Sequence, residues 1–353
     1  MSRMYLISLL SLSAFFLVSC EISCRNEDGD PVDWFIVYKL PKYKINETDG
    51  TGLEYLYLDS KSQEWQLSKF LTNMTHSALG QVLQQLYQSY KSNSTGYMMY
   101  NDEPPGTKNY TTNYGHTKGV LLFDKLQGFW LIHSVPHFPP FPGDGFGYPD
   151  TGKLYGQTAI CVTYNHLQFK KIAAQLLYYN PNVYNCSIPD IYQEDLWSLC
   201  TICQGKKFPW IDPTRLAVLK SAKGELFLNF AKSKYFVDDI ITGWISQILE
   251  VDLLSETWQP KGKELPSNCS LPWHVYNIKQ IALPYLSFYS HYDHSKWCVS
   301  NMYAFTWICI GDLNRNPGQK WRSGGFLCTQ NKLIFKQFRK IVAYFNDCEM
   351  SVY

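Results

Sequence analysis

One short pattern occurs twice in this chain, and the sequence around it is repeated as well. His116-x-Lys118 lies at the head of the run GHTKGVLLFD, and His294-x-Lys296 lies at the head of DHSKWCVS. Two further strand-like runs and a helical pattern follow each pair in the same order. A degenerate duplication of this kind predicts two related halves, each with the same supersecondary unit, that bury a core together.

The runs that follow the two pairs are FWLIHS (129–134) and GQTAICVTY (156–164) in the first half, and TWICIGDLN (306–314) and GGFLCTQN (324–331) in the second. Each set leads into an apolar stripe at helical spacing, from Phe169 to Leu177 and from Ile334 to Phe345. The main difference is an insertion at 133–149, rich in Pro, Gly and aromatic residues, which is expected to be a structured loop.

The rest of the chain mixes helical and strand patterns. A helical stripe from Leu79 to Tyr90 precedes the strand-like TGYMMY, and residues 225–250 read as a long helix broken by Gly243. Hydrophobic residues make up 45% of the chain and charged residues 18%, which is typical of a globular protein and excludes a disordered one.

We therefore predict an α+β fold built from two duplicated halves, each a β-sheet flanked by helices and each with one HxK motif. The N-terminal half is expected at 21–180 and the C-terminal half at 216–353. Between them, 181–215 lacks periodicity and is expected to be an irregular segment held by disulfides.

The first 20 residues, MSRMYLISLLSLSAFFLVSC, have a basic start and a short apolar core, as in a signal peptide. No later stretch has the ~20 apolar residues of a membrane span, so we expect none. Ten cysteines follow Cys20 and predict several disulfides in an oxidising compartment. Six sequons also fit secretory passage: Asn46, Asn73, Asn93, Asn109, Asn185 and Asn268.

The HxK pairs carry the chemistry. In a strand, residues i and i+2 point to the same face, so each histidine lies beside its lysine. Two such faces brought together give a pocket for a phosphodiester, in which the lysines neutralise the non-bridging oxygens. One histidine attacks phosphorus to form a phosphohistidine, and the other protonates the leaving oxygen and then activates water. No metal and no cofactor are required.

A zinc site is the main rival. His133 and His137 are four residues apart, and Cys200-x-x-Cys203 could be a redox pair or half of a zinc knuckle. The sequence contains no HExxH motif and no second CxxC to complete such a site. A disulfide is the favoured role for at least one of these cysteines.

Longer stretches resemble the deoxyribonuclease II family: MYNDEPP, GHTKGVLLFD, GFWLIHSVPHFPPFP, YGQTAICVT, LPSNC, DHSKWCVS and CIGDLNRNPGQKWRSGGFLCTQ. The resemblance covers nearly the whole mature chain. Details such as CRNEDGDPVDWF and LPSNCSLPWHVYNIK are closer to the beta branch of that family. It implies an acid endonuclease that needs no divalent metal and leaves 3′-phosphate ends, on a phospholipase-D-like fold.

By this resemblance His116, Lys118, His294 and Lys296 form the catalytic core. His133, Asp312 and Asn314 are expected to orient the histidines or bind phosphate, although each could also be purely structural. The family pattern implies the disulfides Cys24–Cys161, Cys269–Cys348 and Cys309–Cys328. We expect Cys186–Cys200 as a fourth, which leaves Cys203 and Cys298.

The function expected is hydrolysis of double-stranded DNA, in the lysosome or after secretion. The net charge of +2 becomes more positive as the eight histidines are protonated, which suits a polyanion in an acidic compartment. A phospholipid phosphodiesterase and a non-catalytic DNA-binding secreted protein are the alternatives. The sequence leaves the oligomeric state open, with a monomer favoured.

Overall fold

The structure is a computed structural model that describes residues 21–45, 48–107, 111–206, 211–260, 263–284 and 286–348. The expected signal peptide at 1–20 and the sequons at Asn46 and Asn109 lie outside the described residues. Of the other four sequons, Asn73 and Asn93 are exposed, while Asn185 and Asn268 are partly buried. Glycosylation of these four positions stays a prediction.

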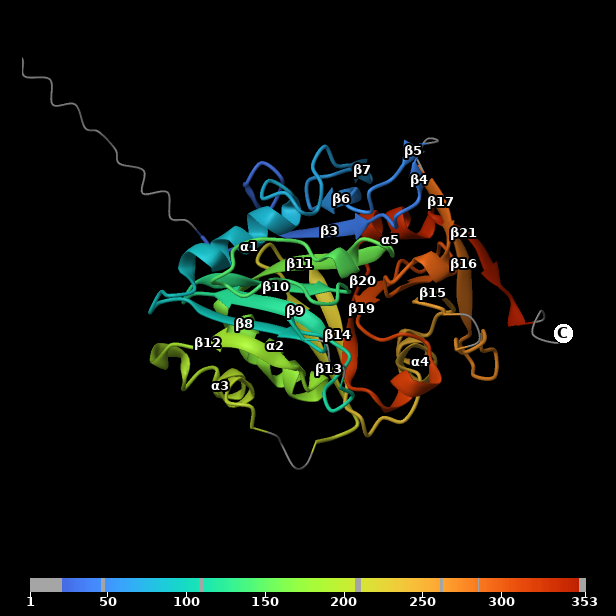
Figure 1. The fold of residues 1–353 in the computed structure, drawn as a ribbon. Helices are drawn as coiled ribbons and strands as arrows, with labels where there is room; N and C mark the ends of the chain where they lie inside the picture. Colours follow the sequence, from blue (N-terminus) through green and yellow to red (C-terminus); the bar gives the residue numbers. More distant parts are fainter. Residues whose placement is uncertain are drawn as a thin grey trace, which may run out of the picture.

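Two large sheets dominate the described chain (Figure 1). The first has the strand order β12-β8-β9-β10-β11-β3-β6-β7. Its strands are β3 (Trp34–Lys39), β6 (Tyr55–Asp59), β7 (Gln66–Leu67), β8 (Gly96–Asn101), β9 (Lys118–Phe123), β10 (Gln127–His133), β11 (Gln157–Asn165) and β12 (Val183–Ser187). Two small hairpins pair β1 (Cys24–Arg25) with β2 (Pro31–Val32) and β4 (Lys44–Ile45) with β5 (Thr48–Asp49).

The second sheet has the order β13-β14-β20-β19-β18-β15-β16-β17, with β21 also paired to β16. Its strands are β13 (Thr214–Lys220), β14 (Leu226–Lys232), β15 (Leu253–Glu256), β16 (Val275–Leu283), β17 (Leu286–Tyr289), β18 (Trp297–Ser300), β19 (Ile308–Gly311), β20 (Gly324–Thr329) and β21 (Val342–Asn346).

Four neighbouring strands have the same arrangement in both sheets. The order β8-β9-β10-β11 in the first corresponds to β15-β18-β19-β20 in the second, and every adjacent pair within each set is antiparallel. One HxK pair lies at the start of β9 and the other directly before β18. A helix follows the last strand of each set, as the repeated sequence pattern predicts.

The helices separate into layers around these sheets (Figure 1). They are α1 (Ala78–Ser89), α2 (His166–Tyr179), α3 (Trp197–Cys203), α4 (Ser246–Leu249) and α5 (Lys332–Arg339), with a π-helical turn at Ile241–Ile245 and short 3-10 turns at Asp150–Gly152, Asp190–Tyr192, Ser290–Tyr292 and Pro317–Trp321. One core cluster joins inner faces of both sheets with α2 and α5. A second lies between the first sheet and α1, and a third lies under the π-helical turn and α4.

Local sequence explains where the main helices begin and end. The side chain of Ser77 accepts a hydrogen bond from the Gly80 amide and caps α1, and Asn331 caps α5 through the amides of Leu333 and Ile334. Asn180 ends α2 in the left-handed conformation, with φ 46°. The cap at Asn180 matters for the site, because its carbonyl accepts a hydrogen bond from Gly115, next to His116.

Three sequence predictions differ from the structure. The long helix expected at 225–250 is strand β14 followed by the π-helical turn and α4, and the C-terminal helix stops at Arg339 so that Val342 begins a strand. The segment 181–215, expected to be irregular, contains β12, which extends the first sheet, and α3. The later part of β14 is largely buried on both faces, and such a strand loses the alternation that separates strand from helix in a sequence.

The disulfides are Cys24–Cys161, Cys269–Cys348, Cys309–Cys328 and Cys186–Cys203. The first three agree with the pairing that the family resemblance implied. The fourth corrects the expected Cys186–Cys200 bond, since Cys200 and Cys298 are free. Both Cys200 and Cys203 lie on α3, three residues apart and therefore on neighbouring parts of one helix face, so sequence spacing could not decide between them.

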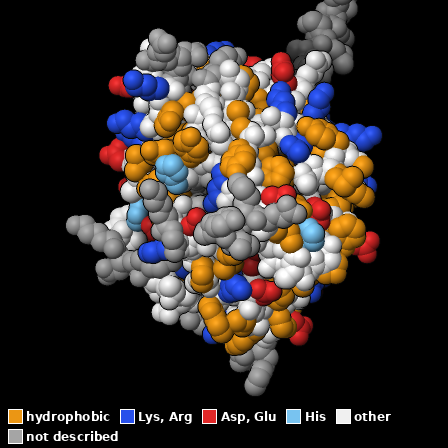
Figure 2. Space-filling view, turned by 90° about the vertical axis from the view of Figure 1, so that its right-hand side faces the viewer, with side chains coloured by type: hydrophobic (Ala, Val, Ile, Leu, Met, Phe, Trp, Pro, Cys, Tyr) orange, Lys and Arg blue, Asp and Glu red, His pale blue; other side chains and the backbone are white. Residues whose placement is uncertain are grey.

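No helix among the described residues is long and apolar enough to cross a membrane. On the face shown in Figure 2, acidic and basic side chains are interspersed among hydrophobic ones. That distribution agrees with a net charge of only +2. The dense groups of charge described below are buried.

The disulfide pattern predicts different reactivities for the two free thiols. Cys200 is partly exposed and Cys298 is fully buried. A maleimide added to the native protein should modify Cys200 and leave Cys298 unmodified until the protein is unfolded. Peptide mapping without reduction should recover a peptide pair joined through Cys186 and Cys203, whereas a Cys186–Cys200 pair would contradict the structure.

Candidate active site

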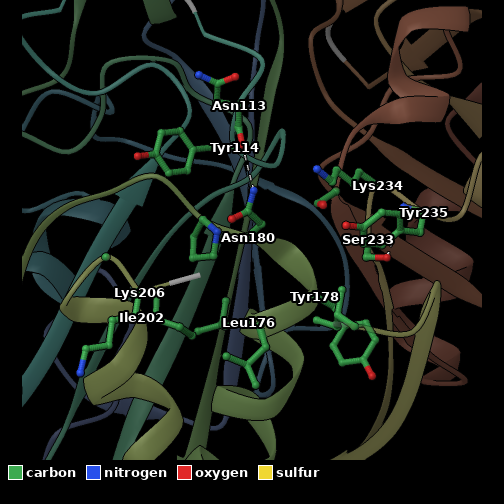
Figure 3. A pocket seen from close by; sticks show the side chains of 15 residues that line it. Asn113, Tyr114, Leu176, Tyr178, Asn180, Ile202, Lys206, Ser233, Lys234 and Tyr235 are labelled. Atoms are coloured by element: carbon green, nitrogen blue, oxygen red, sulfur yellow. Dashed lines mark hydrogen bonds between the residues drawn. The ribbon is translucent and has the colours of Figure 1, made fainter. Parts of the chain in front are cut away.

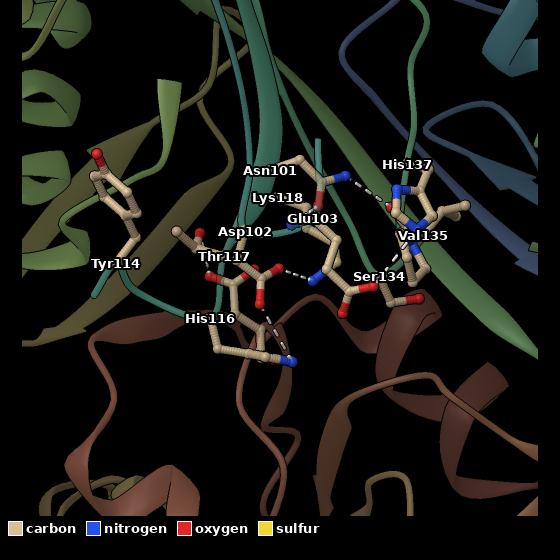
Figure 4. A network of polar contacts seen from close by, with 12 residues as sticks. Asn101, Asp102, Glu103, Tyr114, His116, Thr117, Lys118, Ser134, Val135 and His137 are labelled. Carbon is tan, nitrogen blue, oxygen red and sulfur yellow. Dashed lines mark hydrogen bonds and ion pairs between the residues drawn. The ribbon is translucent and has the colours of Figure 1, made fainter. Parts of the chain in front are cut away.

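The two HxK pairs lie close enough inside the protein for Lys296 to act on His116 and for Lys118 to act on His294. Figure 4 shows the surroundings of the first pair. His116 and Lys118 are 6% and 2% exposed, and His294 and Lys296 are 9% and 1% exposed. In each pair the residue between the two is also buried, so the motif is enclosed on both sides. All four side chains are therefore enclosed by the protein and are not exposed on the outer face of a strand.

Each histidine is held by backbone groups of the opposite half. The His116 amide donates to the Ser323 carbonyl, directly before β20, and the His294 amide donates to the Gly156 carbonyl, directly before β11, both at 2.8 Å. The imidazole side chains also contact backbone carbonyls of the opposite half. Nδ1 of His116 lies 2.7 Å from the Asp312 carbonyl, and Nδ1 of His294 lies 3.0 Å from the Ser134 carbonyl.

These bonds set the tautomer of both imidazoles. A carbonyl oxygen only accepts, so each Nδ1 carries the hydrogen and each Nε2 is left with its lone pair. The side-chain oxygen of Gln157 lies 3.2 Å from Nδ1 of His294 and accepts a second bond, while Ser134 Oγ fixes that amide at 2.5 Å. Two neutral imidazoles with free Nε2 atoms are suited to nucleophilic attack and proton transfer.

Asp102, which the sequence analysis did not single out, organises the cations of the site (Figure 4). It is fully buried directly after β8 and forms a salt bridge with Lys118. Its second oxygen is 3.2 Å from Nη2 of Arg322 and 3.9 Å from Nε2 of His116. Despite burial, which alone would raise it, the pKa of Asp102 is lowered by Lys118, His116 and Arg322.

The signal for Asp102 was present but ambiguous. It stands in MYNDEPP, directly after an apolar strand, which is also an ordinary place for a turn-forming aspartate. Arg322, which reaches Asp102 from the loop before β20, gave no signal at all in the sequence. Only the meeting of the two halves brings these residues together.

Lys296 has no comparable carboxylate partner among the described salt bridges. Its ammonium donates to the carbonyl of its own His294. Burial and the charge of Lys118 lower its pKa well below the ordinary value. The two lysine side chains are therefore close enough to interact electrostatically, and together their positive charges attract an incoming anion.

The supporting residues carry polar atoms without partners. Val135 donates its amide to Nδ1 of His133 at 3.2 Å, so the hydrogen of His133 is on Nε2, and this buried atom has no hydrogen-bond partner. Asp312 accepts from Thr117 Oγ1 with one oxygen at 2.9 Å, and its other oxygen is unpartnered. Buried polar groups are normally satisfied, so these two atoms are candidates for contact with a bound ligand.

Asn314 is only 8% exposed, and its side-chain oxygen is also without a partner. No described contact joins it to the histidines or lysines of the site. The expected role of Asn314 in phosphate binding therefore stays a prediction.

The environment holds both histidines neutral in the free protein. Burial, Lys118, Lys296 and Arg322 lower the pKa of His116 to about 3, although Asp102 opposes them. Burial and the two lysines lower the pKa of His294 well below 6.5. A bound phosphodiester would offset these positive charges and raise both values toward the range where one imidazole can hold a proton.

Comparison with known proteins finds relatives that match nearly the whole chain. The family model "Deoxyribonuclease II" matches residues 23–348. The chain is 52% identical to human Deoxyribonuclease-2-beta over 97% of this chain and 96% of that protein. It is 38% identical to mouse Deoxyribonuclease-2-alpha, covering 96% and 97%, and 34% identical to Plancitoxin-1 of Acanthaster planci, covering 97% of each.

Among solved structures, a polyphosphate kinase from Porphyromonas gingivalis matches with a TM-score of 0.28 and 12% identity, covering 63% of this chain and 31% of that chain. A likeness at this level carries no argument about the fold.

The buried charges predict the effect of Asp102→Asn. The change leaves Lys118 and Arg322 buried without their carboxylate, so the free energy of unfolding should fall by ~3–5 kcal/mol. The measurement is urea unfolding at pH 5. Asp144→Asn, at an exposed aspartate, is the matched control and should change stability by less than ~0.5 kcal/mol. Equal stability of the two variants would show that Asp102 does not neutralise these cations.

Asp312 should make stability depend on pH. Burial raises its pKa to about 7, against the opposing effects of Thr117 and Lys118. An unfolded aspartate releases its proton near ~3.9, so the folded protein binds more protons between those values. Its contribution is full below about pH 4 and is lost as the pH rises to about 7, at up to ~1.4 kcal/mol per pH unit.

Asp312→Asn removes this titration. The difference in unfolding free energy between the variant and the wild-type protein should therefore grow in favour of the variant from pH 4 to pH 7. Chemical denaturation at several pH values measures it. A difference that does not change with pH would mean that Asp312 is already ionised in the folded protein.

Proposed function

The chain belongs to the deoxyribonuclease II family and is a nuclease; from that premise we propose that it hydrolyses phosphodiester bonds of double-stranded DNA under acidic conditions, without a metal, through a phosphohistidine. The observation that carries the proposal is the pair of histidines, each held at Nδ1 by a carbonyl of the opposite half and each with Nε2 free. Lys118, Lys296 and Arg322 surround them with positive charge.

In the first step the scissile phosphate binds among these cations, which offset the charge on its non-bridging oxygens. Nε2 of one histidine attacks phosphorus and forms an N–P bond. The bond between phosphorus and the 5′ oxygen breaks, and the protonated second histidine gives its proton to that oxygen. The products of this step are a free 5′-hydroxyl end and a 3′-phosphoryl group on the histidine.

In the second step the second histidine, now neutral, accepts a proton from water. The hydroxide so formed attacks phosphorus, the N–P bond breaks, and its electron pair returns to the first histidine. The product is a 3′-phosphate end, and both histidines regain their starting states. The fixed cations can serve throughout in the role that a metal plays in other nucleases.

Asp102 makes the two histidines different. Its carboxylate is 3.9 Å from Nε2 of His116, where it stabilises an imidazolium, whereas the charged groups that act most strongly on His294 are cations. We therefore assign the proton-donating role to His116 and the nucleophilic role to His294. A carboxylate beside the attacking atom would repel the phosphate, which also favours this assignment.

Acidic conditions suit this site for a physical reason. The attacking histidine must be neutral, and its environment keeps it so well below pH 6.5. The other must be protonated when substrate is bound, although its pKa in the free protein is about 3. The substrate therefore has to raise the pKa of His116, and a lower pH makes protonation of the complex easier.

The two sheets and their equivalent strands support a phospholipase-D-like pseudo-dimer, with halves near 21–180 and 216–353 joined through 181–215. The unpartnered Nε2–H of His133 and the protonated carboxyl of Asp312 are then donors for the phosphate. An acid optimum in turn favours a lysosomal or secreted location. A phospholipid phosphodiesterase and a non-catalytic DNA-binding protein remain the alternatives.

The catalytic prediction is that His116→Asn and His294→Asn each lower the rate of plasmid cleavage by about 10²–10⁴-fold at pH 5 in EDTA, because each step needs both groups. His76→Asn, at an exposed histidine, is the matched control and should retain activity. The wild-type profile should peak on the acid side, near ~pH 5, and be unchanged by EDTA, with ends that accept phosphate from polynucleotide kinase directly.

Each part of this proposal has a result that would contradict it. Strict dependence on magnesium would overturn the metal-free mechanism, and 5′-phosphate ends would overturn the polarity. Cleavage of a short-chain phospholipid but not plasmid would favour the lipid alternative, and binding without cleavage would favour the non-catalytic one.

The assignment of roles has its own test. Wild-type protein is mixed with an oligonucleotide labelled at its 5′ end, on the fragment that stays bound to the histidine through its 3′ phosphate. The mixture is denatured rapidly under alkaline conditions, in which phosphohistidine survives. Peptide mapping should locate the label on His294. The label should persist in His116→Asn supplied with an activated aryl phosphodiester, whose leaving group needs no proton. A label on His116 would reverse the two roles.

A further inference from the structure

A pocket of about 140 Å³ opens beside the loop that leads into His116 (Figure 3). Its wall includes Asn113 and Tyr114 from the loop before β9, and Lys234 and Tyr235 from the loop after β14. The end of α2 and the end of α3 complete it. The pocket therefore lies where connections of both sheets meet, and it is open to solvent on one side.

Two residues that hold the backbone of Gly115 and His116 in place also line the pocket. Gly115, between Tyr114 and His116, donates to the carbonyl of Asn180, and His116 donates to the carbonyl of Ser323, both at 2.8 Å. Asn180 and Ser323 also line the pocket. A Cβ atom on Gly115 would lie 1.9 Å from the Tyr179 carbonyl, so this loop is pressed against α2. A ligand in the pocket is therefore next to the catalytic loop.

The lining has two chemical parts. Leu176 and Ile202 provide an apolar interior, and Tyr114, Tyr178 and Tyr235 provide aromatic surface. Lys206 and Lys234 are exposed and stand at opposite sides of the pocket in Figure 3. Aromatic surface with lysines at the rim matches a nucleotide, whose base stacks on aromatic rings and whose phosphate binds ammonium groups.

We infer that this pocket binds one unstacked nucleotide of the substrate DNA next to the scissile bond, with the base against the tyrosines and its phosphate at Lys206 or Lys234. The inference rests on the proposed function and names a second part of the same binding site. A regular duplex keeps its bases stacked, and removing one costs a few kcal/mol, least where the base is already unpaired. DNA with an unpaired nucleotide should therefore bind more tightly than a fully paired duplex.

The test measures binding, so it does not depend on cleavage. His294→Asn provides a background with the pocket unchanged. Fluorescence anisotropy at pH 5 in EDTA compares a labelled blunt duplex with the same duplex carrying a one-nucleotide bulge. The parent variant should bind the bulged DNA about ten-fold more tightly, within the range of a single base stack.

Asn113→Trp, added to this background, should remove that preference because the indole fills the pocket. The two hydrogen bonds described for Asn113 use its backbone, so the change leaves them in place. Thr112→Trp is the matched control, because Thr112 is exposed on the same loop and does not line the pocket. It should keep the ten-fold preference, and thermal melting should show equal stability of the two.

The lysines give an independent measurement. Lys206→Gln with Lys234→Gln should reduce the slope of log affinity against log salt concentration by about 1 if one of them holds a phosphate, and by about 2 if both do. Lys223→Gln, at an exposed lysine elsewhere, should not change the slope.

Equal affinity of the parent for bulged and blunt DNA would overturn the inference, as would an intact preference in Asn113→Trp. A slope that the double lysine variant does not change would also contradict it. Failure of the wild-type protein to cut plasmid would instead count against the proposed function, because the binding experiment uses a variant that is not expected to cut.

Discussion

The site depends on an exchange of hydrogen bonds between the two halves. His116 is held by carbonyls at Ser323 and Asp312, and His294 by carbonyls at Gly156 and Ser134. Neither half alone can fix its own imidazole, because the acceptors come from the opposite sheet. Any change in how the sheets pack therefore changes the hydrogen bonds that hold both histidines at once.

The second constraint is the concentration of like charge in a buried place. Lys118, Lys296 and Arg322 act on the same imidazoles, and of these cations Lys118 and Arg322 share the Asp102 carboxylate. Burying several cations together costs free energy. The Asp102 carboxylate reduces that cost, but its one negative charge does not neutralise all three cations. The remaining positive field depresses the pKa of both histidines. An anion placed among these cations would offset the field, so its binding would be coupled to protonation of the histidines.

Sequence reasoning identified the elements that repeat. The HxK pairs, the runs after them and helices α1 and α2 follow from periodicity and spacing. It failed at β14, whose later residues are largely buried on both faces and so lack alternation. It also failed in 181–215, where β12 forms by pairing with β8. Asp102 and Arg322 could not be predicted together, because they are 220 residues apart and meet only through tertiary packing. The choice between Cys200 and Cys203 likewise depends on how α3 packs against β12.

The two histidines have different surroundings, and the pocket beside the His116 loop is part of that difference. On the first half, the loop before β9 is pressed between the end of α2 and Ser323, which leaves a hollow lined by tyrosines and lysines. On the second half, the chain before β18 is instead packed against Gly156, and Trp258 lies edge-on to His294 with ring centroids 5.3 Å apart. The loop of the first histidine thus borders an open pocket, whereas the ring of the second packs against an aromatic side chain. Four strands in the same order in each sheet thus place the same HxK motif in two different surroundings.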